Sequence, residues 1–256
     1  MPKKRTSKSL ENKIAVVAGA TRGAGRGIAC MLGEAGATVY CTGRSARGYP
    51  PTGIYAGRTE TIEETAEMVT QYGGNGIPVR TDHLVEEEVA ALFQRVQRDH
   101  RRLDVLVNDI SEGEAHDWKP FWEVSLEKGF RALRQGINSH ITTSYYAIPL
   151  MIKTRGGLIV EIGDGGSLGY RGNFFYDLVK ISVNRIAYDL SLELHKCFRS
   201  NLDTNDSGLN FRFFQWKMPP LKDFSVSHLT RLDLNHPPTA VGGIGDFRNL
   251  PECRLD

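Results

Sequence analysis

Short apolar runs alternate with segments of helical period from Lys13 to about residue 196 of this chain. The runs are rich in β-branched residues and have no polar face, which is typical of strands buried on both sides of a parallel sheet. Five strand and helix steps of this kind predict an α/β fold with a doubly wound parallel sheet, in the three-layer α/β/α arrangement of the Rossmann type. The expected strands start near Ile14, Thr38, Ile77, Leu103 and Gly157.

Amphipathic helices are expected after these strands. Thr61 and Glu64 have the spacing of a capping box at the start of the second helix. The fourth helix is the longest and has Pro149 near its end. The predicted helices cover residues 25–35, 61–72, 85–96, 125–153 and 176–195.

The charge and cysteine content argue against several classes of protein. Thirty-two Lys and Arg residues against 30 Asp and Glu give a net charge of +2, which provides no attraction to nucleic acid or to an anionic membrane. The four cysteines form no C-x-x-C pair, so neither a metal site nor a disulfide framework is indicated. Because the sequence has no signal-peptide pattern and no run of eighteen apolar residues, the predicted location is cytoplasmic and reducing.

A glycine-rich segment, Gly19-Ala-Thr-Arg-Gly-Ala-Gly25, lies between the first strand and the first helix. Its glycines allow a tight turn in which backbone N–H groups approach a pyrophosphate, and the helix N-terminus favours the same negative charge. Glycine clusters also form plain turns, but this position after an apolar strand and before a helix predicts a dinucleotide site. The predicted cofactor contacts in the turn are Gly19, Thr21, Arg22, Gly23 and Gly25.

The end of the second strand predicts which dinucleotide binds. Sites selective for NAD usually have a carboxylate there to bind the ribose 2′-hydroxyl, whereas this strand continues into Thr42, Gly43 and Arg44. Arg44, together with Arg22 in the glycine turn, is suited to charge-assisted hydrogen bonds with a 2′-phosphate. Most surface arginines are merely solvated, but the joint position of these two favours NADP as the cofactor.

Tyr176 and Lys180 are four residues apart and share one face of the last predicted helix. A phenol is a poor acid–base catalyst at its ordinary pKa of about 10, and a neighbouring ammonium favours the phenolate. Most pairs with this spacing are only surface neighbours. This pair follows the fifth strand, and ligands of open α/β sheets bind at the carboxyl ends of the strands, so both residues are predicted to be catalytic.

The pattern divides the chain into three parts. A flexible basic tail covers residues 1–11, and the dinucleotide-binding catalytic domain covers residues 12–196. The segment 197–256 is rich in Pro, Gly and Asn, and only residues 209–216 have the pattern of a strand.

The order of these motifs resembles the short-chain dehydrogenase/reductase family over about residues 10–196. Within the family, Phe121-Trp-Glu and Gly166-Ser-Leu-Gly-Tyr resemble the subgroup typified by dehydrogenase/reductase member one. The motifs that carry the resemblance are the glycine turn, Leu106-Val-Asn-Asp, Asn138 in the long helix, Gly157-Leu-Ile-Val-Glu-Ile and Tyr176-x-x-x-Lys180.

The resemblance implies a hydride transfer between nicotinamide and a small-molecule carbonyl or alcohol, in a homo-oligomer. Tyr176 then donates or accepts the proton, Lys180 lowers the pKa of the phenol and binds the nicotinamide ribose, and Asn138 supports a water in a proton relay. Asp82 is expected to bind the adenine and Asn108 to line the cofactor cleft. Asp82, Asn108 and Asn138 each also have a local alternative role. Asp82 is then a helix cap, Asn108 is a turn residue, and Asn138 is hydrogen-bonded to its own helix.

Two departures from the family pattern lie near the expected site. The family serine that binds the substrate oxygen, about thirteen residues before the tyrosine, is replaced by Gly163, with Asp164 next to it. An ionised Asp164 raises the pKa of the phenol, and Ser167 can replace the donor only if its loop folds inward. The family's Asn-Asn-Ala-Gly is Asn108-Asp-Ile-Ser111 here, which predicts a charge and crowding beside the cofactor.

Three functions are compatible with the sequence. The first is an NADP-dependent oxidoreductase; the second is a nucleotide-binding protein with little or no turnover, because the serine and the family's C-terminal lid are missing. The third, a structural or interaction protein, fits the positions of Lys180 and Arg44 poorly.

The segment 112–122 and the C-terminal segment are expected to shape the substrate pocket. Aromatic residues such as Trp118, Phe121 and Trp122 indicate either an apolar wall or ordinary core packing.

Overall fold

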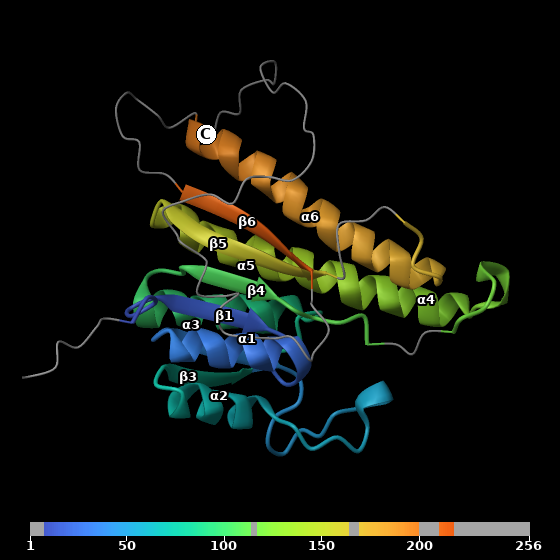
Figure 1. Cartoon of the computed structure of the whole chain (residues 1–256), viewed down its shortest axis with the longest axis horizontal. Coiled ribbons are helices and arrows are strands. Elements are labelled where there is room, and N and C mark those ends of the chain that lie inside the picture. Colours follow the sequence, from blue (N-terminus) through green and yellow to red (C-terminus); the bar gives the residue numbers. More distant parts are fainter. Residues whose placement is uncertain (1–7, 114–116, 164–168, 200–209, 218–256) are drawn as a thin grey trace, which may run out of the picture.

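The computed structural model describes residues 8–113, 117–163, 169–199 and 210–217. In this part of the chain, parallel strands form one sheet in the order β3-β2-β1-β4-β5-β6 (Figure 1). The strands are β1 (Ile14–Ala18), β2 (Thr38–Gly43), β3 (Asn75–Arg80), β4 (Val105–Asn108), β5 (Gly156–Gly163) and β6 (Asn210–Lys217). The strand order reverses between β1 and β4, which places a crevice for a ligand at the carboxyl ends of these two strands.

Helices cover both faces of the sheet and confirm the predicted three layers. Short 3₁₀ turns are η1 (Gly53–Tyr55) and η2 (Phe121–Glu123), and η3 (Arg134–Asn138) is a π-helix between α4 and α5. The α-helices are α1 (Gly23–Glu34), α2 (Ile62–Gln71), α3 (Glu86–His100), α4 (Leu126–Leu133), α5 (Ser139–Lys153) and α6 (Phe174–Arg199). None of the described helices has the length and hydrophobicity needed to cross a membrane.

Alternating side chains of the strands fill two separate cores. Ile14 and Val16 of β1 pack on one face with side chains of α3 and α5, whereas Ala15 and Val17 pack on the other face with α1 and α2. Because both faces are covered, β1 is apolar along its whole length and all of its residues are buried. Residues 14–18 therefore have the burial that their composition predicts.

The structure differs from the sequence prediction at two places and contains the strand predicted in the C-terminal segment. The helix expected over residues 125–153 contains the π-helix η3, a local widening that apolar periodicity does not reveal. Strand β3 begins at Asn75, two residues before the expected start, because it pairs with β2 from Thr38 onward. The strand expected at 209–216 is present as β6, which pairs in parallel with β5 and lies beside α6 (Figure 1).

Other predictions fall outside the described residues. These are the structures of residues 1–7 in the basic tail, of Asp164 and Ser167 after β5, and of the C-terminal residues 218–256.

Candidate active site

The glycine turn joins β1 to α1 at the carboxyl edge of the sheet. Gly19 has a φ of 90°, and a Cβ there would lie 2.2 Å from the backbone oxygen of Asp109. A Cβ at Gly25 would lie 2.3 Å from the backbone oxygen of Gly19. Gly23 has a φ of 59°, and a Cβ on this residue would have no described atom within 4 Å. The turn therefore requires glycine for its close packing inside and is open on its outer side at Gly23.

Asp109 brings a carboxylate to this turn from the loop after β4. Helix α1 has no acidic residue in its first turn and no side-chain cap from Arg22, but Asp109 accepts a hydrogen bond from the backbone N–H of Gly25. Burial raises the pKa of Asp109 to about 7, although the Gly25 bond and the charges of Lys180 and His140 act in the opposite direction. The predicted charge beside the cofactor therefore lies at the helix N-terminus, where a phosphate is expected.

Arg22 is held by residues of the β2–α2 connection. Its Nη2 is 3.3 Å from Ser45 Oγ, its Nε is 3.9 Å from Glu60 Oε2, and its guanidinium lies 4.6 Å from the centroid of the Tyr55 ring. Burial lowers the pKa of Arg22, and the Glu60 carboxylate opposes that change. Glu60 is itself paired with Arg58. Phosphate binding by Arg22 stays a prediction, and an acidic residue that the sequence prediction did not include lies beside it.

Arg44 directly follows β2 and is exposed, whereas Thr21 of the glycine turn is buried. A Cβ at Gly43 would lie 2.5 Å from Thr21 Oγ1, so the glycine turn packs directly on the end of β2. Because Ser45 bonds to Arg22, the structure brings Arg22 close to the residue that follows Arg44. The two predicted arginines therefore lie at the same corner of the sheet.

Tyr176 and Lys180 lie in the first turns of α6. Asn173 fixes the start of this helix: its Oδ1 accepts a hydrogen bond from the backbone N–H of Tyr176 at 2.9 Å, and its Nδ2 donates to the backbone oxygen of Asp117. Lys180 Nζ is 5.3 Å from the centroid of the Tyr176 ring. The helix therefore sets the ammonium beside the phenol, as the spacing of four residues predicts.

Lys180 also contacts the loop after β4. Its Nζ is 3.3 Å from Glu112 Oε2, and the exposed fractions of the two side chains are 16% and 8%. The same loop carries Asp109, which contacts the glycine turn. The loop after β4 therefore links Lys180 of α6, through Glu112, to the glycine turn, through Asp109.

A family model, short chain dehydrogenase, matches residues 13–197. The chain belongs to the short-chain dehydrogenase family. Dehydrogenase/reductase SDR family member 1 of Mus musculus is 36% identical over 192 residues, which is 73% of this chain and 57% of that protein. This likeness confirms the subgroup predicted from the sequence motifs. The chain spans just over half the length of the mouse relative.

Solved structures of this family share the fold. A metagenomic short-chain oxidoreductase in complex with NADP has a TM-score of 0.65 at 22% identity and is matched over 81% of this chain and 82% of its own. An NADH-dependent reductase complexed with NAD has a TM-score of 0.64 at 18% identity, over 82% of this chain and 79% of its own. At these identities the two structures support the Rossmann-type fold of the short-chain dehydrogenase and leave the choice of cofactor open.

The structure shows the surroundings of three further residues predicted to contact the cofactor or to support the proton relay, which are Asn108, Asp82 and Asn138. Asn108 is fully buried and its Nδ2 donates to Glu161 Oε1 at 2.7 Å and to Ser144 Oγ at 3.1 Å, so its side chain links β4 to β5 and α5. Asp82 Oδ1 accepts a hydrogen bond from Leu84 N–H at 3.0 Å, a local turn before α3, whose N-cap residue is Val85 and not Asp82.

Asn138, which was predicted to support a proton relay, is the last residue of the π-helix η3. Its side chain is exposed at the end of the π-helix η3, whereas Gly136 of the same helix faces α6. A Cβ at Gly136 would lie 2.4 Å from Val179 Cγ1. The relay role that the family resemblance implies for Asn138 therefore stays a prediction, and the residue of η3 that packs against α6 is Gly136.

Gly163 is the last residue of β5, at the position of the family serine. A Cβ there would lie 3.1 Å from Asn184 Oδ1 of α6. The backbone at this position is therefore close to α6, and it offers no hydroxyl to a substrate oxygen.

A buried ion pair lies behind the β4 loop. His140 of α5 and Glu161 of β5 are 1% and 0% exposed, and His140 Nδ1 is 2.5 Å from Glu161 Oε2. His140 Nε2 donates to the backbone oxygen of Ile110 at 3.0 Å, so the pair holds the loop that carries Asp109 and Glu112. Burial alone lowers the pKa of His140, but the charge and hydrogen bond of Glu161 outweigh burial, and the pKa is raised.

Sequence analysis missed the roles of Glu112, His140 and Glu161. Glu161 had a detectable signal, because it is a carboxylate within an otherwise apolar strand and needs a partner in the core. His140 and Glu112 had no such signal in the sequence, since neither periodicity nor spacing links His140 to residue 161 or Glu112 to residue 180.

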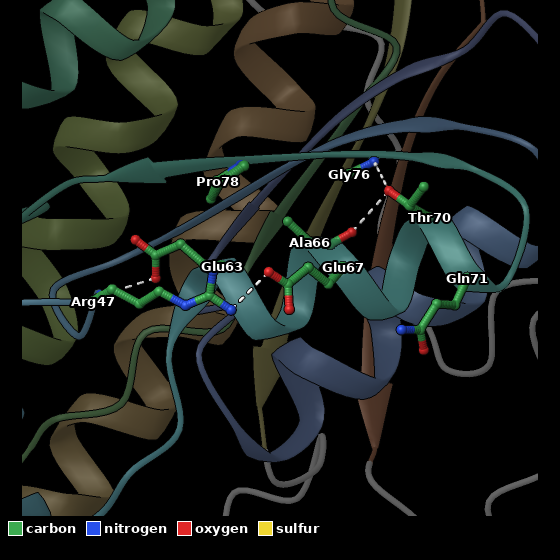
Figure 2. A pocket seen from close by; sticks show the side chains of 8 residues that line it. All are labelled: Arg47, Glu63, Ala66, Glu67, Thr70, Gln71, Gly76 and Pro78. Carbon is green, nitrogen blue, oxygen red and sulfur yellow. Dashed lines mark hydrogen bonds and ion pairs between the residues drawn. The ribbon is translucent and has the colours of Figure 1, made fainter.

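A surface depression of about 390 Å³ lies away from this site, between α2 and β3 at the edge of the sheet. Figure 2 shows Arg47 between two glutamates: its backbone N–H donates to Glu63 at 3.0 Å, and its guanidinium donates to Glu67 at 2.7 Å. These carboxylates are engaged by Arg47, and the glycine turn does not line the depression. It is therefore not the candidate active site.

Proposed function

We propose that this protein is an NADP-dependent oxidoreductase that transfers a hydride between nicotinamide and a carbonyl or alcohol substrate. The observation that carries the proposal is the position of Lys180 beside the Tyr176 ring on α6. The Lys180 Nζ also forms an ion pair with Glu112 of the loop after β4, the loop that contacts the glycine turn. The open outer side of Gly23 and the N-terminus of α1, which has no side-chain cap from Arg22, fit the phosphates of a dinucleotide. The Asp109 carboxylate is the feature that opposes them.

The residues of the chain have separate roles in this reaction. The bound cofactor supplies or takes up the hydride. The Tyr176 hydroxyl donates a proton to the substrate oxygen during reduction and accepts it during oxidation. The Lys180 ammonium stabilises the phenolate and donates hydrogen bonds to the nicotinamide ribose, while the glycine turn holds the pyrophosphate. Tyr176 therefore holds the proton and Lys180 sets its acidity.

The preference for NADP rests on Arg22 and Arg44 at the corner next to β2. Arg22 already bonds to Ser45, and exposed Arg44 is free to turn toward a 2′-phosphate. Glu60, 3.9 Å from Arg22, acts against an added phosphate and is held by Arg58. The two arginines and the one carboxylate leave a net positive charge at this corner, which favours a 2′-phosphate.

Calorimetric titration with NADPH and NADH tests the fold, the cleft and the selectivity together. We expect the wild type to bind NADPH more tightly, and Arg44→Asp to weaken NADPH by at least about tenfold with little effect on NADH. The matched control is Arg47→Asp, because Arg47 is exposed and bonded to α2 instead. Folded wild-type protein that binds neither nucleotide at millimolar concentration would refute the proposal.

The second candidate function is nucleotide binding with little or no turnover. It is favoured by Gly163, which provides no hydroxyl to the substrate oxygen, and by Asp109, whose charge opposes the cofactor. Loss of one such donor typically reduces the rate by about a hundredfold or more. Tight NADPH binding without reduction of any carbonyl in a broad panel would select this function over the first.

The substrate is proposed to be an apolar carbonyl or alcohol compound. Trp118 and Trp122 are 66% and 80% exposed, so ordinary core packing does not account for them. Phe121 lies 4.3 Å, between ring centroids, from Phe174 at the start of the helix that carries Tyr176. The aromatic segment therefore adjoins the proposed catalytic residues and offers apolar contacts to a substrate.

We propose a homo-oligomer, supported by an apolar stripe along α4 and α5. Leu126, Phe130, Ile141 and Tyr145 are each at least half exposed and recur at helical spacing.

The cytoplasmic location stays a proposal: in the part of the chain that the structure describes, Cys30 and Cys41 are buried free thiols, which fits a reducing compartment.

A further inference from the structure

Glu112 fills a space between two helices of the proposed active site. It follows β4 in the chain and lies against Gly136 of the π-helix η3, where a Cβ would be 3.4 Å from Glu112 Cβ. On its other side it contacts Lys180 of α6. Glu112 therefore packs against Gly136, whereas the space that a side chain at residue 136 would need is taken by Val179.

The environment of Glu112 calls for a positive partner. Only 8% of its side chain is exposed, and an ionised carboxylate in such a position is unfavourable unless it is paired and hydrogen-bonded. Lys180 Nζ lies 3.3 Å from Glu112 Oε2, within the distance of an ion pair. Glu112 therefore restrains the ammonium in a side chain that otherwise has four rotatable bonds.

The same contact changes the electrostatics at the phenol. Lys180 Nζ is 5.3 Å from the Tyr176 ring centroid, so its charge favours the phenolate. A carboxylate bonded to that ammonium offsets part of the positive charge that the phenol experiences. Glu112 thus acts on Tyr176 through Lys180.

Other charged groups around the pair have partners of their own. Asp109 and His140 both interact electrostatically with Lys180; Asp109 accepts a hydrogen bond from Gly25, and His140 is paired with Glu161. On α6 itself, Asp177 is paired with Arg171. Of the carboxylates in the described part of the chain, Glu112 is the one that forms an ion pair with Lys180.

We propose that Glu112 is a positioning residue for the catalytic pair: its buried carboxylate holds the Lys180 ammonium beside Tyr176 and reduces the net positive charge at the phenol. This inference rests on the proposed function, because it assigns Glu112 to the same reaction. It concerns the acidity of Tyr176 and not the binding of the nucleotide.

A titration of the phenol tests the proposal without a substrate. Ionisation of Tyr176 is followed by ultraviolet difference absorbance, as the difference between each protein and its Tyr176→Phe counterpart. We expect Glu112→Gln to move the midpoint toward lower pH by about one unit, because the neutral amide keeps the shape and removes the opposing charge. Glu112→Asp keeps the charge and is expected to stay near the wild-type midpoint.

Glu193→Gln is the matched control, because Glu193 is an exposed glutamate farther along the same helix. An unchanged midpoint in Glu112→Gln, or an equal shift in Glu193→Gln, overturns the proposal. Glu112→Met provides a second neutral side chain of similar length if the amide variant does not fold. Loss of the fold in both neutral variants, but not in Glu112→Asp, would assign Glu112 a purely structural role and also overturn it.

The outcome is separable from that of the proposed function. Calorimetry with NADPH reports whether the wild type binds the cofactor, whereas the phenol titration needs no cofactor. A wild type that binds no nucleotide refutes the proposed function, and the midpoint of Glu112→Gln still decides whether Glu112 controls the charge at Tyr176.

Discussion

The carboxylate of Asp109 accepts a hydrogen bond from the backbone N–H of Gly25, in the first turn of helix α1. Burial raises the pKa of this carboxyl to about 7. A phosphate that binds the same turn therefore meets a neutral side chain below neutral pH and a negative one above it. We therefore expect phosphate binding at this turn to depend on pH.

Cofactor affinity is expected to depend on the protonation of Asp109. If the nucleotide binds when this carboxyl is neutral, the dissociation constant rises about tenfold between pH 6 and pH 8. Asp109→Asn removes the charge and should make the affinity nearly constant over that range, as measured by calorimetric titration with NADH. An equal pH dependence in the wild type and in Asp109→Asn would show that another group is responsible.

The same residue should affect stability with a defined sign. The pKa of Asp109 is higher in the folded protein than its ordinary value of 3.8, so its favourable contribution is complete below about pH 4 and is lost as pH rises through about 7. Asp109→Asn should therefore raise the melting temperature by a few degrees at pH 8 and have a smaller effect at pH 4. A larger gain at pH 4 than at pH 8 would contradict this assignment.

The buried pair of His140 and Glu161 should contribute strongly to stability. Removing one partner, as in Glu161→Gln, leaves a buried charge and is expected to cost about 3–5 kcal/mol in the free energy of unfolding. Because the pKa of His140 is raised on folding, its contribution is present below about pH 6.5 and falls as pH increases above that value. Denaturant unfolding at several pH values measures both effects; a cost below about 1 kcal/mol, or a contribution that grows with pH, would argue against the pair.

Tyr176→Phe removes the proposed proton donor while leaving the ring in place. We expect turnover of any carbonyl substrate found to fall by at least about a hundredfold, with unchanged affinity for NADPH. Tyr188→Phe on the same helix is the control, because its ring contacts Arg185 instead. Comparable activity in Tyr176→Phe and the wild type would exclude Tyr176 as the acid–base residue.

Two glycines near the start of α1 should respond to alanine in opposite directions. A Cβ at Gly25 would lie 2.3 Å from the backbone oxygen of Gly19, so Gly25→Ala forces the turn to shift, lowers the melting temperature and weakens NADPH binding. Gly27 has no described atom within 4 Å of such a Cβ, so Gly27→Ala should stabilise the helix by about 0.5–1 kcal/mol. Thermal unfolding of both variants measures the difference, and equal effects would refute the steric argument.

Local chemistry made most of the fold predictable. Thr61 Oγ1 accepts the Glu64 N–H at 3.2 Å, as the capping pattern indicates, and β1 is buried along its whole length. The spacing of four residues likewise brought Lys180 beside Tyr176. Each of these features depends on residues a few positions apart, so the sequence carries the signal directly.

The position of Asn138 was not predictable in this way. A π-turn contains more residues than an α-turn, so the side chains that follow it are rotated relative to the expected helix face. Gly136 of this π-turn consequently packs against Val179 of α6, and Glu112 of the loop after β4 lies next to it.

By itself, the amino-acid sequence determined the order of strands and helices, the glycine turn, the tyrosine and lysine of α6, and the family. Only the tertiary structure decided that Asp109 reaches Gly25, that Glu112 reaches Lys180, and that His140 pairs with Glu161. The physical reason is that periodicity and turn chemistry act between near neighbours in the chain. Buried charges, in contrast, are set by whichever distant groups the packed sheet and helices bring within a few ångströms.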